Sequence, residues 1–143
     1  MGAVQKAQCS SSHGKVVEPI RTLLIEDSSP ALRALVNLLE THSAVEIVGT
    51  AADGETGLKL AGKLRPDLVI ADLEMVGLGG LEVARMLRKR FPALRLVVVS
   101  IHDGLTWLNL SRANGADAFL SKHRVHAELL ELIDRLFTVC AQS

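Results

Sequence analysis

The chain has 143 residues, of which 48% are hydrophobic and 22% charged, and its 16 basic and 16 acidic side chains give a formal charge of zero with neutral histidines. This size suits one domain with a buried core, and zero net charge argues against binding to nucleic acid or to an anionic membrane, which depends on clustered positive charge. Apolar runs such as 96–99 are too short to span a membrane, and Cys9 and Cys140 indicate neither a disulfide framework nor a zinc motif.

Residues 1–18 lack the apolar segment of a secretory signal, and the stretch Ser10–Gly14 is rich in serine and glycine. We therefore expect a flexible leader over residues 1–18, a folded domain over 19–140, and a cytoplasmic location.

Five short apolar segments are expected to form strands. They contain many β-branched residues and no polar alternation, which is typical of strands buried on both faces of a parallel sheet. The segments are 22–25, 45–51, 68–71, 94–99 and 118–120.

Segments with helical spacing separate the strands. Ser29 is expected to cap the first helix, with Pro30 in its first turn, and Asp53 is expected to cap the second. The third helix is predicted at about 80–91, and the fourth, whose apolar pattern polar residues dilute, at about 105–113. Apolar residues recur at i, i+3, i+4 and i+7 in the first and last helices, at Leu32, Leu35, Val36 and Leu39 and at Leu129, Leu132, Ile133 and Leu136.

Five strand–helix units in succession predict an α/β fold, a (βα)5 open parallel five-stranded sheet with helices on both faces, because such crossovers are right-handed. Functional groups of this class of fold gather at the carboxyl ends of the strands. The polar residues that follow the predicted strands there are Glu26, Asp27, Asp72, Ser100 and Lys122.

The joint placement of these residues is more informative than any one of them. An aspartate after a strand is, by itself, usually a turn or cap residue. Two unit charges about 4 Å apart repel by roughly 4 kcal/mol at an effective dielectric constant near 20. Three neighbouring carboxylates therefore indicate a bound cation or a raised pKa, and Mg²⁺, which binds a few carboxylates and completes its shell with water and phosphate oxygens, suits them best.

Four segments of the chain resemble those of response-regulator receiver domains of two-component signalling: Leu24–Asp27, Asp72–Gly80, Ser100 after three valines, and Phe119–Lys122. The resemblance covers about residues 20–138, and the stretches Ser100–Asp103 and Ala113–Ala116 are most similar to receivers of NarL/LuxR-type transcription regulators. It implies a flavodoxin-like fold and a signalling switch that receives a phosphoryl group from a histidine kinase or a phosphotransfer protein.

By this resemblance, Asp72 is the phospho-acceptor, a carboxylate nucleophile that forms an acyl phosphate. Mg²⁺ (or Mn²⁺) binds to Asp27, to Asp72 and to the backbone carbonyl of Glu74, while Glu26 acts through a metal-bound water. These roles agree with the physics of phosphoryl transfer, which needs positioning and cationic stabilisation more than acid–base groups.

The resemblance also implies how the phosphoryl group is held and read. Lys122 and Ser100 stabilise it, Ser100 and Phe119 form the switch, and Glu74 and His102 tune dephosphorylation. The switch changes the face built from the fourth helix, fifth strand and fifth helix and controls an output, expected to be transcription, with homodimerisation on phosphorylation. The domain itself contacts neither nucleic acid nor membrane, and it catalyses only its own phosphoryl transfer and dephosphorylation.

Four positions depart from the family pattern. Glu26 replaces a more frequent aspartate, Val76 and His123 replace prolines, and Ile101 replaces a common alanine. None of these changes removes a chemical group of the site.

Two alternative functions remain open. One is a receiver-like interaction module that works without phosphorylation. The other is a Mg²⁺-dependent aspartyl phosphohydrolase, which normally needs a second aspartate two residues after the nucleophile, where this chain has Glu74.

Overall fold

The computed structural model describes residues 19–75 and 77–138, and it places five parallel strands in one sheet. The strand order is β2-β1-β3-β4-β5, which confirms the expected (βα)5 open parallel sheet. The predicted leader at 1–18, Val76, Cys9 and Cys140 lie outside the described residues. The strands are β1 (Ile20–Ile25), β2 (Val45–Ala51), β3 (Leu68–Asp72), β4 (Arg95–Ser100) and β5 (Ala118–Ser121).

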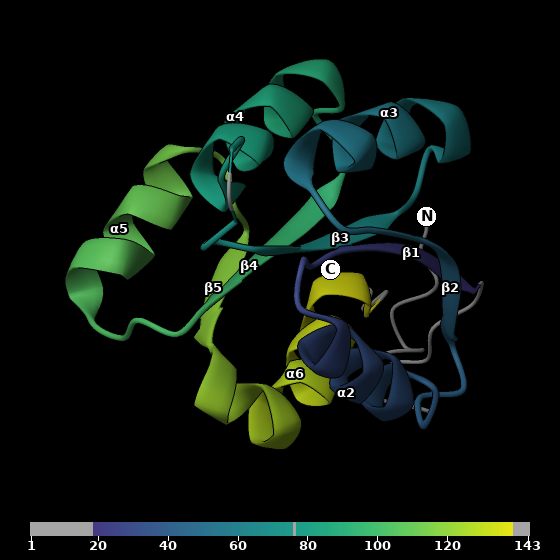
Figure 1. Cartoon of the computed structure of the whole chain (residues 1–143). Helices are drawn as coiled ribbons and strands as arrows, with labels where there is room; N and C mark the ends of the chain where they lie inside the picture. The colour runs from purple at the N-terminus through teal and green to yellow at the C-terminus, as the bar shows by residue number, and fades with distance from the viewer. Residues whose placement is uncertain (1–18, 76, 139–143) are drawn as a thin grey trace, which may run out of the picture.

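Helices cover both faces of the sheet. Figure 1 shows α2 and α6 on one face, and α3, α4 and α5 on the other. In the described ranges no helix is both long enough and apolar enough to cross a membrane. The helices are α2 (Ser29–Leu39), α3 (Gly54–Leu64), α4 (Gly80–Arg90), α5 (Leu105–Ala113) and α6 (Lys122–Phe137).

The two faces of the sheet have separate apolar cores. Successive side chains of a strand point to opposite faces, so Leu23 and Val69 pack on the α3–α4 side while Leu24 and Ile70 pack on the α2–α6 side. All five residues of β3 are buried, which is why this strand appears in the sequence as an unbroken apolar run that ends in Asp72.

β2 corrects the expectation that every strand is buried on both faces. It is one of the two edge strands of the sheet, and only Ala51 among its seven residues is buried. Its apolar composition resembles that of a central strand, but the sheet order leaves one side of it without a neighbouring strand.

The cap of α2 is also one residue earlier than predicted. Ser28, in an extended conformation, accepts a hydrogen bond from the backbone N–H of Ala31 at 3.3 Å, whereas Ser29 already belongs to the helix. The predicted cap of α3 is confirmed, because the Asp53 carboxylate accepts from the N–H of Thr56 at 2.8 Å.

The direction of the chain connections reverses at the carboxyl ends of β1 and β3. These strands are neighbours, yet the helices that follow them, α2 and α4, lie on opposite faces of the sheet (Figure 1). Open α/β sheets bind ligands at such a reversal. Gly80 lets α4 begin close to β3, because a Cβ at this position would lie 2.5 Å from the carbonyl oxygen of Asp72.

Candidate functional site

Three carboxylates gather at the carboxyl ends of β1 and β3. Glu26 and Asp27 follow β1, Asp72 ends β3, and one oxygen atom of each lies within 4.8 Å of the others. Glu26 and Asp72 are buried, whereas Asp27 is exposed. The pairing of β1 with β3 brings these side chains together, as the sequence led us to expect for strand ends at one edge of a parallel sheet.

Lys122 supplies the positive charge of the site. It begins α6 directly after β5, and its Nζ atom lies 3.3 Å from an oxygen of Glu26 and 3.3 Å from an oxygen of Asp72. Partial burial by itself lowers the pKa of this ammonium, but the charges of Asp72 and Glu26 outweigh that effect and the net direction is upward. Lys122 is therefore a fixed cation beside the two buried carboxylates.

Burial changes the acidity of Asp72. Asp72 is 2% exposed. Its pKa is raised from 3.8 to about 7, mainly because burial removes water from the carboxylate and secondly because the Glu26 carboxyl is a neighbour. Lys122 and the backbone N–H of Glu74, which donates to Asp72 at 3.2 Å, act in the opposite direction. One cation is thus not enough to balance the carboxylates, and a second one would stabilise the ionised form of Asp72.

The set of donor atoms suits a hard divalent cation. Carboxylate oxygens within 4.8 Å of one another match the oxygen ligands that Mg²⁺ binds, and exposed Asp27 leaves the cluster open to water. Three of the residues that the resemblance implies for the metal site, Glu26, Asp27 and Asp72, thus lie together. Glu74, whose backbone carbonyl completes the implied set, is two residues beyond Asp72 in the chain.

Ser100 ends β4 beside this cluster and is fully buried. Its hydroxyl donates a hydrogen bond to the Glu74 carboxylate and accepts one from the backbone N–H of His102 at 2.9 Å. The second oxygen of Glu74 accepts from the N–H of Ile101 at 3.2 Å. The sequence singled out Glu74 and Ser100 separately, but it gave no signal of this contact, because loop conformation and side-chain rotamers decide it.

His102 connects the site to α5. The ring of His102 stacks on Trp107, with centroids 4.8 Å apart, and its Nε2 lies 3.6 Å from the Glu74 carboxylate. Phe119 is half-buried against the same core as Trp107. α5 itself is weakly anchored, as its sequence suggested: its N-cap Gly104 provides no side-chain cap, and Ser111 is its one buried residue.

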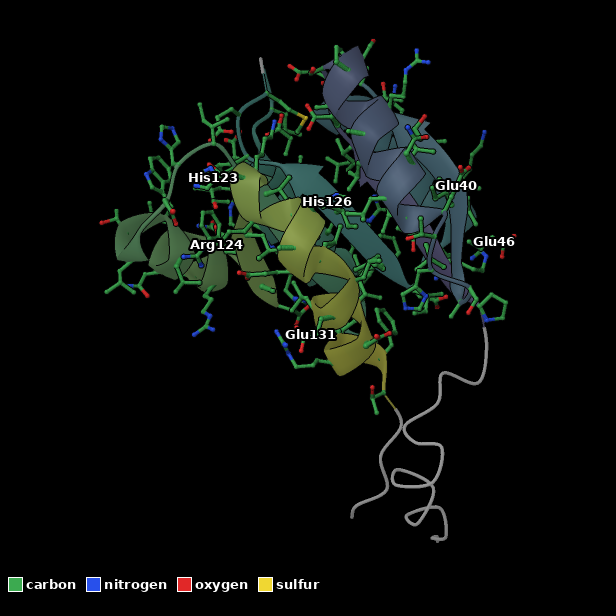
Figure 2. All side chains as sticks on the ribbon, turned by 90° about the horizontal axis from the view of Figure 1, so that it is seen from below. Glu40, Glu46, His123, Arg124, His126 and Glu131 are labelled. Atoms are coloured by element: carbon green, nitrogen blue, oxygen red, sulfur yellow. The ribbon has the colours of Figure 1, made fainter. Side chains whose placement is uncertain are left out.

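Two further departures from the family pattern, His123 and Ile101, lie at the surface. His123 is exposed and lies 3.4 Å from Asp103, and Figure 2 shows it with Arg124 and His126 along the first turns of α6. Ile101 is 62% exposed.

Comparison with known proteins agrees with the resemblance seen in the sequence. The family model of the response regulator receiver domain matches residues 22–134 of this chain. The chain is 34% identical over 116 residues to the nitrate/nitrite response regulator protein NarL of Escherichia coli, covering 81% of this chain and 54% of that protein. It is 31% identical over 115 residues to the transcriptional regulatory protein MctR of Rhizobium johnstonii, covering 80% of this chain and 54% of that protein.

Solved structures show the same fold. The signal receiver domain of NarL from Mycobacterium tuberculosis aligns with a TM-score of 0.77 at 27% identity, covering 84% of this chain and 98% of that one. A LuxR-family DNA-binding response regulator from Staphylococcus aureus aligns with a TM-score of 0.77 at 28% identity, covering 83% of this chain and 99% of that one.

The extent of these matches defines what they establish. The chain spans about half the length of the curated relatives NarL and MctR. It is also 42% identical over 84 residues to a protein-glutamate methylesterase of Koribacter versatilis, but this covers only 23% of that enzyme. The family model covers residues 22–134, most of the chain, so this chain belongs to the response regulator receiver domain family of two-component signalling.

Proposed function

We propose that this domain is a phosphorylation-controlled switch whose acceptor is Asp72. In the proposed step, a carboxylate oxygen of Asp72 attacks the phosphorus atom of a donor, and an acyl phosphate forms as the bond from phosphorus to the leaving group breaks. The leaving group takes the electron pair of that bond. The observation that carries the proposal is the contact of Lys122 with Asp72 inside a cluster of two further carboxylates.

The chain's own residues would position and neutralise the transferred group. The Lys122 ammonium lies 3.3 Å from Asp72 and can pair with phosphoryl oxygens that carry the added negative charge. Asp27, Asp72 and the carbonyl of Glu74 would hold Mg²⁺ (or Mn²⁺), with Glu26 acting through water. The bound ion would supply the second positive charge that the acidic cluster requires.

The donor we propose is a histidine kinase or a phosphotransfer protein in the cytoplasm. Ser100 and Phe119 would form the switch, and the surface that responds would be built from α5, β5 and α6. Exposed apolar side chains in the β4–α5 loop and in α5 suit a contact surface for an output domain or for a second copy; they are Ile101, Leu105 (71% exposed) and Leu110 (40% exposed). Regulation of transcription is the output that the similarity to NarL and MctR favours.

Intact-mass spectrometry tests the acceptor. Incubation with a small-molecule phosphoryl donor and Mg²⁺ should add the mass of one phosphoryl group, and a chelator should prevent the addition. Asp72→Asn should abolish it, while Asp67→Asn, which changes an exposed carboxylate outside the cluster, should leave it intact. Equal labelling of wild-type protein and the Asp72→Asn variant would contradict the proposal.

A further inference from the structure

The Glu74 side chain joins two loops at the edge of the proposed site. Glu74 lies in the β3–α4 loop, and its carboxylate accepts hydrogen bonds from the Ser100 hydroxyl and from the Ile101 N–H. Ser100 is the last residue of β4, and Ile101 is the first residue of the β4–α5 loop. A single carboxylate therefore fixes the end of β4 and the first residue after it, and we refer to these two hydrogen bonds as the Glu74 contact.

The Glu74 contact occupies the only proton that the Ser100 hydroxyl can donate. Its oxygen already accepts from the N–H of His102 at 2.9 Å, so the hydroxyl proton is directed to Glu74. A serine hydroxyl has one O–H donor. Donation from Ser100 to a phosphoryl group on Asp72 therefore requires that the hydrogen bond to Glu74 first breaks.

The Glu74 contact is connected to the surface of α5 through the neighbouring residue His102. The residue after Ile101 is His102, whose ring lies 3.6 Å from the Glu74 carboxylate and stacks on Trp107. α5 holds few buried residues of its own, and a poorly anchored helix moves at low free-energy cost. Release of the Glu74 contact would free the loop that carries His102, and Trp107 would report it.

We propose that Glu74 is a positioning residue that holds Ser100 and the β4–α5 loop in the unphosphorylated arrangement and that opposes phosphorylation until its contact breaks. The inference rests on the proposed function of Asp72 and deepens it. Because a phosphoryl group and the Glu74 carboxylate are both negatively charged, the added group both competes for Ser100 and repels Glu74. The two arrangements of the loop are therefore alternatives, and the phosphoryl group selects one of them.

Two substitutions at Glu74 separate its charge from its hydrogen bonds. Glu74→Gln removes the charge but keeps one oxygen that can accept from Ser100, whereas Glu74→Ala removes the charge and both hydrogen bonds. Titration with beryllofluoride and Mg²⁺, a phosphoryl mimic, should show several-fold tighter binding for the glutamine variant than for wild type. The alanine variant should bind at least about tenfold more tightly than the glutamine variant, because only the alanine variant leaves Ser100 without its acceptor at position 74. This tenfold difference in affinity corresponds to about 1.4 kcal/mol.

A second readout does not depend on ligand affinity. Without ligand, the Trp107 fluorescence of Glu74→Ala should shift toward the spectrum of wild-type protein saturated with beryllofluoride, whereas a merely structural loss would not resemble that state. Glu82 lies on the rim of the same small cavity as Glu74, His102 and Trp107, but no hydrogen bond joins it to the described part of the β4–α5 loop. The variants Glu82→Gln and Glu82→Ala should therefore bind alike and keep the wild-type Trp107 spectrum.

The outcomes distinguish this inference from the function on which it rests. If wild-type protein does not bind beryllofluoride, the proposed function of Asp72 fails, and the inference fails with it. If wild-type protein binds, but the two Glu74 variants bind alike and both keep the wild-type Trp107 spectrum, Glu74 acts only through its charge. The proposed positioning role is then overturned while the acceptor role stands.

Discussion

Replacement of Asp72 by asparagine should stabilise the metal-free protein, and the gain should depend on pH. The pKa of Asp72 is about 7 in the folded protein against an ordinary value of 3.8. A raised pKa means that the folded state binds the proton more tightly. The contribution of Asp72 to stability is therefore fully present below pH 3.8 and is lost as pH rises through about 7.

The size of the effect follows from the same two values. At about 1.4 kcal/mol for each tenfold change in proton affinity, the interval from 3.8 to about 7 corresponds to an upper value on the order of 4 kcal/mol above pH 7. Asparagine has a similar shape and carries no charge at any of these pH values. Asp72→Asn should thus add little to the free energy of unfolding near pH 4 and several times more at pH 8.

Urea unfolding in the presence of a chelator, followed by circular dichroism at pH 4.5 and pH 8, measures this difference. Glu46→Gln is the matched control. Glu46 is exposed on the edge strand β2 (Figure 2) and pairs with Arg21 near the start of β1, whereas the carboxylate cluster lies at the other end of that strand. Its effect should be small and equal at both pH values. If Asp72→Asn increases the free energy of unfolding equally at pH 4.5 and pH 8, the reasoning is refuted, because the buried charge of Asp72 would then not be what destabilises the folded protein.

Three further predictions concern charge and packing. Lys122→Ala should slow phosphorylation by a small-molecule donor by on the order of 10²-fold, the typical loss for one electrostatic contact to a transition state; an unchanged rate would remove Lys122 from the mechanism. Arg88→Ala should lower the free energy of unfolding by roughly 2–3 kcal/mol, because this guanidinium donates to three backbone carbonyls and one carboxylate. Its control, Arg135→Ala, breaks an exposed i,i+4 pair and should change the free energy of unfolding by less than about 0.5 kcal/mol. Equal losses for the two variants in urea titrations would contradict this prediction. Gly80→Ala should destabilise the protein by more than about 1 kcal/mol, because the added Cβ would lie 2.5 Å from the backbone of β3. Gly62→Ala, inside α3 with only a flexible side chain 3.4 Å away, should stabilise the protein by up to about 1 kcal/mol. A stability change of the same sign for both variants would argue against a close approach at Gly80.

The sequence was sufficient to locate the site because the residues of the site lie at the ends of strands or directly after them. Glu26 and Asp27 directly follow β1, Asp72 ends β3, and in a parallel sheet all carboxyl ends lie at one edge. The position of Lys122 follows in the same way from the end of β5. Short apolar runs therefore predicted which groups meet, and the resemblance to receiver domains assigned their roles.

Features that depend on sheet order or on rotamers were not predictable in this way. The composition of β2 did not reveal that it is an edge strand, and the sequence pattern placed the cap of α2 on Ser29 rather than on the adjacent Ser28. The Glu74 contact needs two loops in a particular conformation. Arg88 also had no signal in the sequence, although it connects α4 to Asp117 and to loop carbonyls, because long side chains on a helix surface are usually solvated.

The most direct test of the central claim locates the modified residue itself. After reaction with a phosphoryl donor and Mg²⁺, an acyl phosphate on an aspartate is reduced by borohydride to homoserine, which peptide mass spectrometry identifies by position. The account predicts homoserine at position 72 and at no other aspartate, and none when Mg²⁺ is withheld. Homoserine at position 27 or 67 instead, or a phosphorylated protein that yields no homoserine at all, would contradict it.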